Sequence, residues 1–320
     1  MKDIPIQIKN LLKKQKYHLV GNHSAIKKCR WTHKSLVFDQ ACYKERFYGI
    51  FSHRCMQVTP SLLWCTHCCD FCWRLQPSDI DINWDQTKID VPINDPEFIL
   101  DGFYKEWKRI LSGYKPLSHD KVTWEKWEEA NNPFSIAISL SGEPLIYPRI
   151  NELIELTKKR GLITFVVSNA TRPEIVKNLT EPNQLYFSLI SPNKENYEQI
   201  CRPLILNAWE KIMESFSYLE SFSCPTVLRL TLSDHKNLKN PEEFAKIIEK
   251  YSPTHVEAKG YMYLGFSRRR GMKVNNMPLH KKIKEFAIKL ADNCGYYFID
   301  DVERSRVVLL SKQKKIKKFS

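Results

Sequence analysis

Three cysteines in one short loop have the residue type and spacing needed to hold a metal centre. Cys65, Cys69 and Cys72 form a Cys-x3-Cys-x2-Cys pattern. Three thiolates on one tight loop can ligate three irons of a [4Fe–4S] cluster and leave the fourth iron open. Zinc is the alternative, because Cys65 with Cys68, and Cys69 with Cys72, each have the spacing of a zinc half-site. The spacing alone leaves both metals open.

A second array of cysteines lies upstream. Cys29, Cys42 and Cys55 are separated by 12 residues each. They could complete zinc tetrahedra, hold a second iron–sulfur cluster with one unligated iron, or be buried thiols that happen to be evenly placed. In a reducing compartment, clustered cysteines are more often metal ligands than disulfides. The remaining scattered cysteines are expected to be small buried apolar side chains, namely Cys201, Cys224 and Cys294.

Composition limits the class of protein. A chain of 320 residues with 42% apolar content can bury a large core. No stretch approaches the roughly 20 consecutive apolar residues of a membrane span. The first 16 residues are lysine-rich and lack the apolar segment of a signal peptide, so a cytoplasmic protein without membrane association is expected.

The net charge of +14 favours a polyanionic partner, with nucleic acid the usual candidate. The positive charge is concentrated in four segments: Lys9, Lys13, Lys14 and Lys16; Lys27, Lys28 and Arg30; Arg268, Arg269 and Arg270; and the tail 312–318.

The elements that must position these residues alternate between strands and helices. Apolar residues recur at helical spacing over 95–113, which predicts a helix that buries Phe98, Ile99, Phe103, Trp107 and Ile110. A second helix is expected over 120–130, and a short one within residues 1–16. Apolar runs predict six strands, at 55–58, 134–140, 162–167, 184–189, 226–232 and 255–262. Helices are expected to start near Pro148, Pro173, Leu204, Pro241 and Pro278.

Strands that alternate with helices imply parallel βαβ units. Six repeats are too few for a closed eight-fold barrel, so an α/β fold with a partial (β/α)6 TIM-like barrel is expected. Reactive groups in such folds gather at the carboxyl ends of the strands. The predicted organisation is an N-terminal extension over 1–54 that carries the upstream cysteines, the barrel domain over 55–300, and a C-terminal strand with a basic tail over 301–320.

The residues after two of the predicted strands distinguish between the metals. Ser141-Gly142-Glu143-Pro144 resembles the Gly-Gly-Glu-Pro motif of the radical S-adenosylmethionine superfamily, with Ser141 in place of its first glycine. In that superfamily the motif binds the methionine amino group, and polar residues at the position of Ser168 and Asn169 contact the ribose. The resemblance implies that Cys65, Cys69 and Cys72 hold a [4Fe–4S] cluster that chelates S-adenosylmethionine and releases a 5′-deoxyadenosyl radical. Cys68 is then a bystander.

The chain also resembles the archaeal family of tRNA wybutosine-synthesising protein 1, the 4-demethylwyosine synthases. The resemblance rests on both cysteine arrays and on segments spread from residue 29 to about 290: Cys42-Tyr43-Lys44, Arg229-Leu230-Thr231-Leu232, Glu257-Ala258-Lys259-Gly260-Tyr261, Gly265-Phe266-Ser267-Arg268 and Asn276-Met277-Pro278-Leu279-His280. It implies that the adenosyl radical takes a hydrogen from the N-methyl group of N1-methylguanosine, 3′ of the anticodon in tRNA-Phe. Coupling with pyruvate, C–C cleavage and ring closure would then give the tricyclic base.

The resemblance also implies roles for residues beyond the first cluster. A second [4Fe–4S] cluster on Cys29, Cys42 and Cys55 would hold pyruvate, with Lys44 forming an imine to it. Lys259 is a second candidate, for proton transfer or substrate contact. The flavodoxin-like domain fused in eukaryotic relatives is missing, so an external flavodoxin or ferredoxin is the expected electron donor, and the enzyme is expected to be a monomer. Two alternatives stay open: another two-cluster radical enzyme such as a glycyl-radical activase, and a non-catalytic zinc-dependent RNA-binding protein.

Overall fold

The computed structural model describes residues 3–319, whose contacts divide into two compact units. Unit 1 comprises residues 3–64, 88–166 and 317–319, and unit 2 comprises residues 65–87 and 167–316. The chain therefore leaves unit 1 directly before Cys65. Within residues 3–319, every helix is too short or too polar to cross a membrane.

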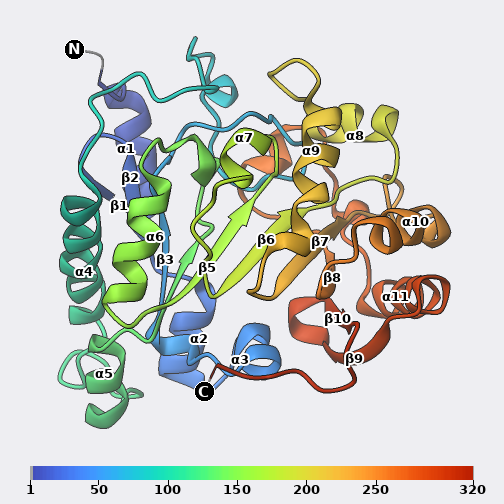
Figure 1. Ribbon diagram of the computed structural model, residues 1–320. Helices are drawn as coiled ribbons and strands as arrows, with labels where there is room; N and C mark the ends of the chain where they lie inside the picture. Colours follow the sequence, from blue (N-terminus) through green and yellow to red (C-terminus); the bar gives the residue numbers. More distant parts are fainter. Residues whose placement is uncertain (1–2, 320) are drawn as a thin grey trace. The chain divides into compact units, whose positions relative to one another are not determined.

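Unit 1 contains the N-terminal strands and the first parallel strands (Figure 1). Its strands pair in the order β1 (Tyr17–Val20), β2 (Ser24–Lys27), β3 (Cys55–Thr59), β4 (Ser135–Ile138) and β5 (Ile163–Ser168). Strands β1 to β3 are antiparallel, whereas β3, β4 and β5 are parallel. Its helices are α1 (Ile6–Lys14), α2 (Arg30–Phe38), α3 (Tyr43–Tyr48), α4 (Pro96–Ser112), α5 (Trp124–Asn131) and α6 (Ile150–Lys159).

Unit 2 continues the alternation. Its strands pair in the order β6 (Gln184–Ser188), β7 (Thr226–Leu232), β8 (His255–Gly260), β10 (Val307–Ser311) and β9 (Tyr297–Val302). Strands β6 to β8 are parallel, and β10 and β9 complete the edge as antiparallel strands. Its helices are α7 (Pro173–Val176), α8 (Lys194–Cys201), α9 (Ala208–Ser217), α10 (Pro241–Tyr251) and α11 (His280–Cys294), of which α10 and α11 pack side by side (Figure 1).

Helix α4 buries most of the apolar face that its sequence pattern predicts. The Asp95 carboxylate caps its start by accepting a hydrogen bond from the Glu97 amide at 2.9 Å. Ile99, Phe103 and Trp107 follow at four-residue steps and are fully buried. The prediction that Phe98 shares this face is wrong: Phe98 is 54% exposed, because it lies about 100° around the helix from Ile99.

The α/β class is confirmed, since each of the six predicted strands is present and pairs in parallel with at least one other of the six within its unit. The predicted helices near Pro148, Pro173, Pro241 and Pro278 are also present, although α9 begins at Ala208 rather than near Leu204. The sequence patterns did not predict β1, β2, α2, α3, α8 and β9. The three-part domain division at residues 54 and 300 follows expected function rather than contacts, and it stays a prediction.

Candidate active site

The loop that carries Cys65, Cys69 and Cys72 is fixed within unit 2 by the end of helix α8. The Cys68 amide donates to the Cys201 carbonyl at 3.1 Å, and the Asp70 amide donates to the Ile200 carbonyl at 3.0 Å. The Asp70 carboxylate also pairs with Lys236 at 2.6 Å. A loop held by its own backbone keeps its side chains in place before a ligand binds.

Arg270 closes the loop from another side. Its guanidinium donates to the carbonyl of Cys72 at 2.5 Å and to that of Arg74 at 2.8 Å. It also pairs with the Asp79 carboxylate, through an Nε–Oδ1 contact of 2.7 Å. The sequence pattern predicted that Arg268, Arg269 and Arg270 together form a basic segment for a polyanionic partner. That prediction is wrong for Arg270. Its side chain is only 6% exposed, and its guanidinium is bound to the loop carbonyls and to Asp79.

The thiols of the loop fit a three-ligand cluster. A hydrogen bond with Cys201, burial, and the nearby thiols of Cys65 and Cys72 together raise the pKa of Cys69. Three thiols this close repel one another when ionised, and a bound iron centre relieves that repulsion because it deprotonates coordinating thiols outright. The Cys68 sulfur instead accepts a hydrogen bond from Gln86 Nε2 at 3.4 Å. Its surroundings therefore differ from those of the other three.

The polar residues after β5 contact the same loop. The Asn169 side-chain amide donates to Thr66 Oγ1 at 2.8 Å and to Cys65 Sγ at 3.7 Å. The Ser168 hydroxyl accepts a hydrogen bond from the Ala170 amide at 2.9 Å, which shapes the turn that follows. Asn169 is thus next to a predicted iron ligand.

In unit 1, the turn Ser141–Pro144 is bound to the segment that leads into the loop. The Glu143 amide donates to the Trp64 carbonyl at 2.7 Å, and the Ser141 hydroxyl donates to the Leu62 carbonyl at 2.8 Å. Gly142 has a φ of +68°, and a Cβ there would lie 1.7 Å from the Ser61 carbonyl oxygen. Only glycine allows this approach.

The upstream cysteines begin three elements of unit 1. Cys29 and Cys42 are the N-cap residues of α2 and α3, and Cys55 is the first residue of β3. Burial raises the pKa of the Cys55 thiol, while Ser135 and the nearby Lys44 ammonium lower it and Cys29 raises it. Cys29, Cys55 and Lys44 are therefore close enough to interact electrostatically.

Lys44 lies on helix α3 and is 7% exposed, which is unusual for a lysine. Its Nζ lies 3.9 Å from the centroid of the Phe165 ring. A buried amine beside an aromatic face and a group of thiols has the surroundings of a functional lysine rather than of a solvated one.

Comparison with known proteins decides between the remaining interpretations. A model of the radical SAM superfamily matches residues 60–248, and a model of wyosine base formation matches residues 250–312. The chain is 44% identical to the S-adenosyl-L-methionine-dependent tRNA 4-demethylwyosine synthase of Pyrococcus abyssi, over 96% of this chain and 89% of that protein. It is 39% identical to the synthase of Methanocaldococcus jannaschii, over 97% of both chains.

The chain belongs to the tRNA 4-demethylwyosine synthase family. Two solved structures agree with this conclusion. The structure of TYW1 with a lysine-pyruvate adduct bound superposes with a TM-score of 0.87 at 36% identity. The crystal structure of archaeal TYW1 superposes with a TM-score of 0.80 at 33% identity, and each comparison covers 98% of both chains.

In this member of the synthase family, strands β7 and β8 carry a buried charged group. Arg229 binds the fully buried Glu257 carboxylate through Nη2 at 2.8 Å and Nε at 3.0 Å. Tyr186 donates a third hydrogen bond to Glu257 at 3.1 Å. Lys259 follows two residues later on β8, so it projects from the same face of the strand as Glu257.

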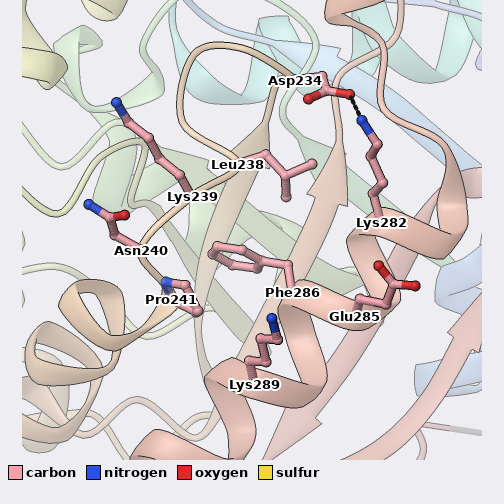
Figure 2. A pocket seen from close by; sticks show the side chains of 9 residues that line it. All are labelled: Asp234, Leu238, Lys239, Asn240, Pro241, Lys282, Glu285, Phe286 and Lys289. Atoms are coloured by element: carbon pink, nitrogen blue, oxygen red, sulfur yellow. Dashed lines mark hydrogen bonds and ion pairs between the residues drawn. The ribbon is translucent and has the colours of Figure 1, made fainter.

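A pocket of about 390 Å3 lies in unit 2, between the loop after β7 and helix α11. Figure 2 shows Phe286 and Leu238 in its apolar part and the Asp234–Lys282 ion pair at one side. None of the residues predicted to act in a 4-demethylwyosine synthase lines it. The candidate residues are therefore, in unit 2, the Cys65–Cys72 loop and the turn after β5 and, in unit 1, the upstream cysteines and the turn after β4.

Proposed function

We propose that this protein converts N1-methylguanosine in tRNA-Phe into 4-demethylwyosine, with pyruvate as the second substrate. The observation that carries the proposal is the Cys65–Cys72 loop, whose Cys72 carbonyl is held by Arg270. The chain that contains this loop matches wyosine-forming radical enzymes over nearly its whole length. We also infer a C–C lyase step, because ring closure in this reaction requires pyruvate to lose a carbon fragment. A glycyl-radical activase and a zinc-dependent RNA-binding protein are not favoured by these relatives.

In the proposed site, Cys65, Cys69 and Cys72 hold the first [4Fe–4S] cluster. When bound, the cluster and S-adenosylmethionine supply a 5′-deoxyadenosyl radical that accepts a hydrogen atom from the methyl group. The residues Ser141, Gly142, Glu143 and Pro144, with Ser168 and Asn169, would hold S-adenosylmethionine. Glu143 suits the methionine ammonium, because its carboxylate is buried and a charge-assisted hydrogen bond there is strong.

For pyruvate, we propose an imine on Lys44 and a second [4Fe–4S] cluster on Cys29, Cys42 and Cys55. The support is the burial of Lys44 and its electrostatic interaction with Cys55. A related TYW1 structure bears a lysine-pyruvate adduct, which agrees with an imine in this family. Lys259, on the strand that carries Glu257, remains the second candidate for proton transfer.

For the tRNA, we propose contacts with an aromatic–arginine surface in unit 2. The surface consists of Trp73, Arg74, Tyr263, Phe266, Arg268 and Arg269. Arg268 lies 4.9 Å from the Tyr263 ring centroid, and Arg269 lies 5.1 Å from that of Phe266. Proteins bind splayed nucleotides by stacking bases on such rings and by attracting phosphates with arginine. The Phe266 amide donates to the Trp73 carbonyl at 3.0 Å, so the surface is joined to the end of the cysteine loop.

The test is incubation of the anaerobically reconstituted protein with tRNA containing N1-methylguanosine, pyruvate, S-adenosylmethionine and a reductant. We expect a tricyclic nucleoside and 5′-deoxyadenosine, detected by mass spectrometry after digestion. A colourless protein that saturates with zinc would contradict the proposal. An external flavodoxin or ferredoxin as donor, a monomeric state and a cytoplasmic location are part of the proposal, and size-exclusion chromatography tests the second of these.

A further inference from the structure

A fourth buried sulfur lies beside the proposed cluster ligands. Cys201, the last residue of α8, is fully buried. Its sulfur, the Cys69 sulfur and a ring nitrogen of His67 all lie within 4.8 Å of one another. The Cys201 and Cys69 thiols share a hydrogen bond. None of the roles proposed above uses Cys201.

The backbone fixes this contact. Cys68 and Asp70, on either side of Cys69, donate to the carbonyls of Cys201 and Ile200 at 3.1 and 3.0 Å. The Leu204 amide returns a hydrogen bond to the Thr66 carbonyl at 2.8 Å. The two sulfurs are therefore neighbours because two stretches of chain are bonded together, and not only because two side chains happen to meet.

His67, Cys69 and Cys201 could also be considered as a separate metal site. Against this, His67 Nε2 is already within 2.6 Å of the Tyr197 hydroxyl. Cys69 also lies among the thiols of Cys65 and Cys72, and it completes the three ligands that the first cluster requires. If Cys69 bound a separate metal, the first cluster would keep only two protein ligands.

We propose that the Cys201 S–H group donates a hydrogen bond to the Cys69 thiolate when that thiolate ligates iron, and that this bond raises the reduction potential of the cluster. The inference rests on the cluster assignment in the proposed function. Coordination removes the proton from Cys69, which leaves its sulfur as an acceptor beside the Cys201 thiol. A donor to a ligating sulfur stabilises the added negative charge of the reduced cluster. The single electron comes from a low-potential one-electron donor, and the step transfers no proton.

The test is a redox titration of the reconstituted holoenzyme. The titration is monitored through the electron paramagnetic resonance signal that changes when S-adenosylmethionine is added. That response separates the first cluster from the second. We expect Cys201→Ala to lower the midpoint potential by about 59 mV, which corresponds to a tenfold change in the one-electron equilibrium. Cys201→Ser keeps a hydrogen-bond donor, so its midpoint potential should be closer to that of the parent protein. Cys294→Ala removes another buried thiol of unit 2, at the end of α11, and should leave the potential unchanged.

Two results would overturn the inference. One is a Cys201→Ala protein with full iron content and an unchanged potential. The other is loss of the cluster from both Cys201→Ala and Cys201→Ser, because Cys201 would then be a ligand or a packing residue. A parent protein without any cluster that responds to S-adenosylmethionine would instead overturn the proposed function, before the variants are compared.

Discussion

Arg270 and Asp79 form a buried ion pair between positions 191 residues apart in the sequence. Their side chains are 6% and 4% exposed. The same guanidinium donates to the carbonyls of Cys72 and Arg74, so the pair is joined to the loop that carries the proposed iron ligands. The shape of the loop therefore depends on a residue near the opposite end of the chain.

We predict that Arg270→Met destabilises unit 2 and weakens cluster retention. Removing one partner of a buried pair leaves an uncompensated charge, here Asp79, which costs roughly 3–5 kcal/mol. Urea unfolding and iron content after desalting measure the two effects. Arg269→Met is the matched control, because its side chain is exposed. Full iron content in Arg270→Met would show that the loop keeps its shape without the clamp.

Gly142→Ala should disrupt the turn Ser141–Pro144. The new Cβ would lie 1.7 Å from a backbone oxygen, and the residue would have to keep a φ of +68°. We expect a loss of more than ~1 kcal/mol of stability and weaker binding of S-adenosylmethionine, measured by equilibrium dialysis. Gly161→Ala is the control, since it has a φ of +73° but no atom within 4 Å of its Cβ. Equal effects from both variants would attribute the loss to backbone strain alone.

Lys44→Ala should abolish borohydride trapping of pyruvate on the protein. Without the imine, pyruvate loses its fixed position, and we expect product formation to fall by roughly 100-fold or more. Peptide mass spectrometry of the trapped protein locates the adduct. Lys259→Ala should retain the adduct while it slows product formation. Trapping at Lys259 in the parent protein would reverse the two roles.

The double variant Arg268→Ala, Arg269→Ala should bind tRNA more weakly. Each arginine that contacts a phosphate contributes about 1 to the slope of log K against log salt, so the slope should fall by about 2. Filter binding at several salt concentrations gives both quantities. Arg304→Ala, another exposed arginine of unit 2, should bind like the parent. An unchanged slope in the double variant would remove these arginines from the interface.

His255 predicts a pH dependence of stability. Burial lowers its pKa from 6.5 to about 4. The folded state therefore holds neutral His255 while the unfolded state binds a proton, so the contribution is complete above pH 6.5 and is lost as the pH falls toward 4. The loss should total about 3 kcal/mol. Urea unfolding at pH 7, 6 and 5 should show a flatter profile for His255→Gln than for the control His235→Gln, whose side chain is exposed.

Local patterns were sufficient for the regular part of the fold. Strand β7 has the predicted bounds, because a run of buried residues between a proline and a polar turn has one reasonable interpretation. Helix α8 was missed, since its polar sequence carries only a weak apolar stripe. The end of α8 makes backbone hydrogen bonds to the cysteine loop, and such long-range contacts leave no local pattern.

The predicted roles of the site residues stay predictions, but the structure shows which of their contacts the sequence could indicate. Cysteine spacing and the glycine-containing turn predicted candidate ligands that lie within short segments of the chain. The sequence did not predict the role of Arg270, because a run of three arginines shows charge but not burial. It also gave Cys201 the ordinary interpretation of a buried thiol. Its partner Cys69 lies 132 positions earlier in the chain, and only the folded unit brings the two sulfurs together.

The hydrogen bonds from Arg270 to the cysteine loop join distant parts of the sequence, and this has a consequence for biosynthesis. The cysteine loop is translated early, but Arg270, which donates to the Cys72 carbonyl, lies 198 residues further along the chain. At roughly 5–20 residues per second, the ribosome needs about 10–40 s to reach it. During that interval the three thiols are present without their clamp. We therefore expect iron–sulfur assembly on this loop to be a late, essentially post-translational event, with the nascent thiols kept reduced until then.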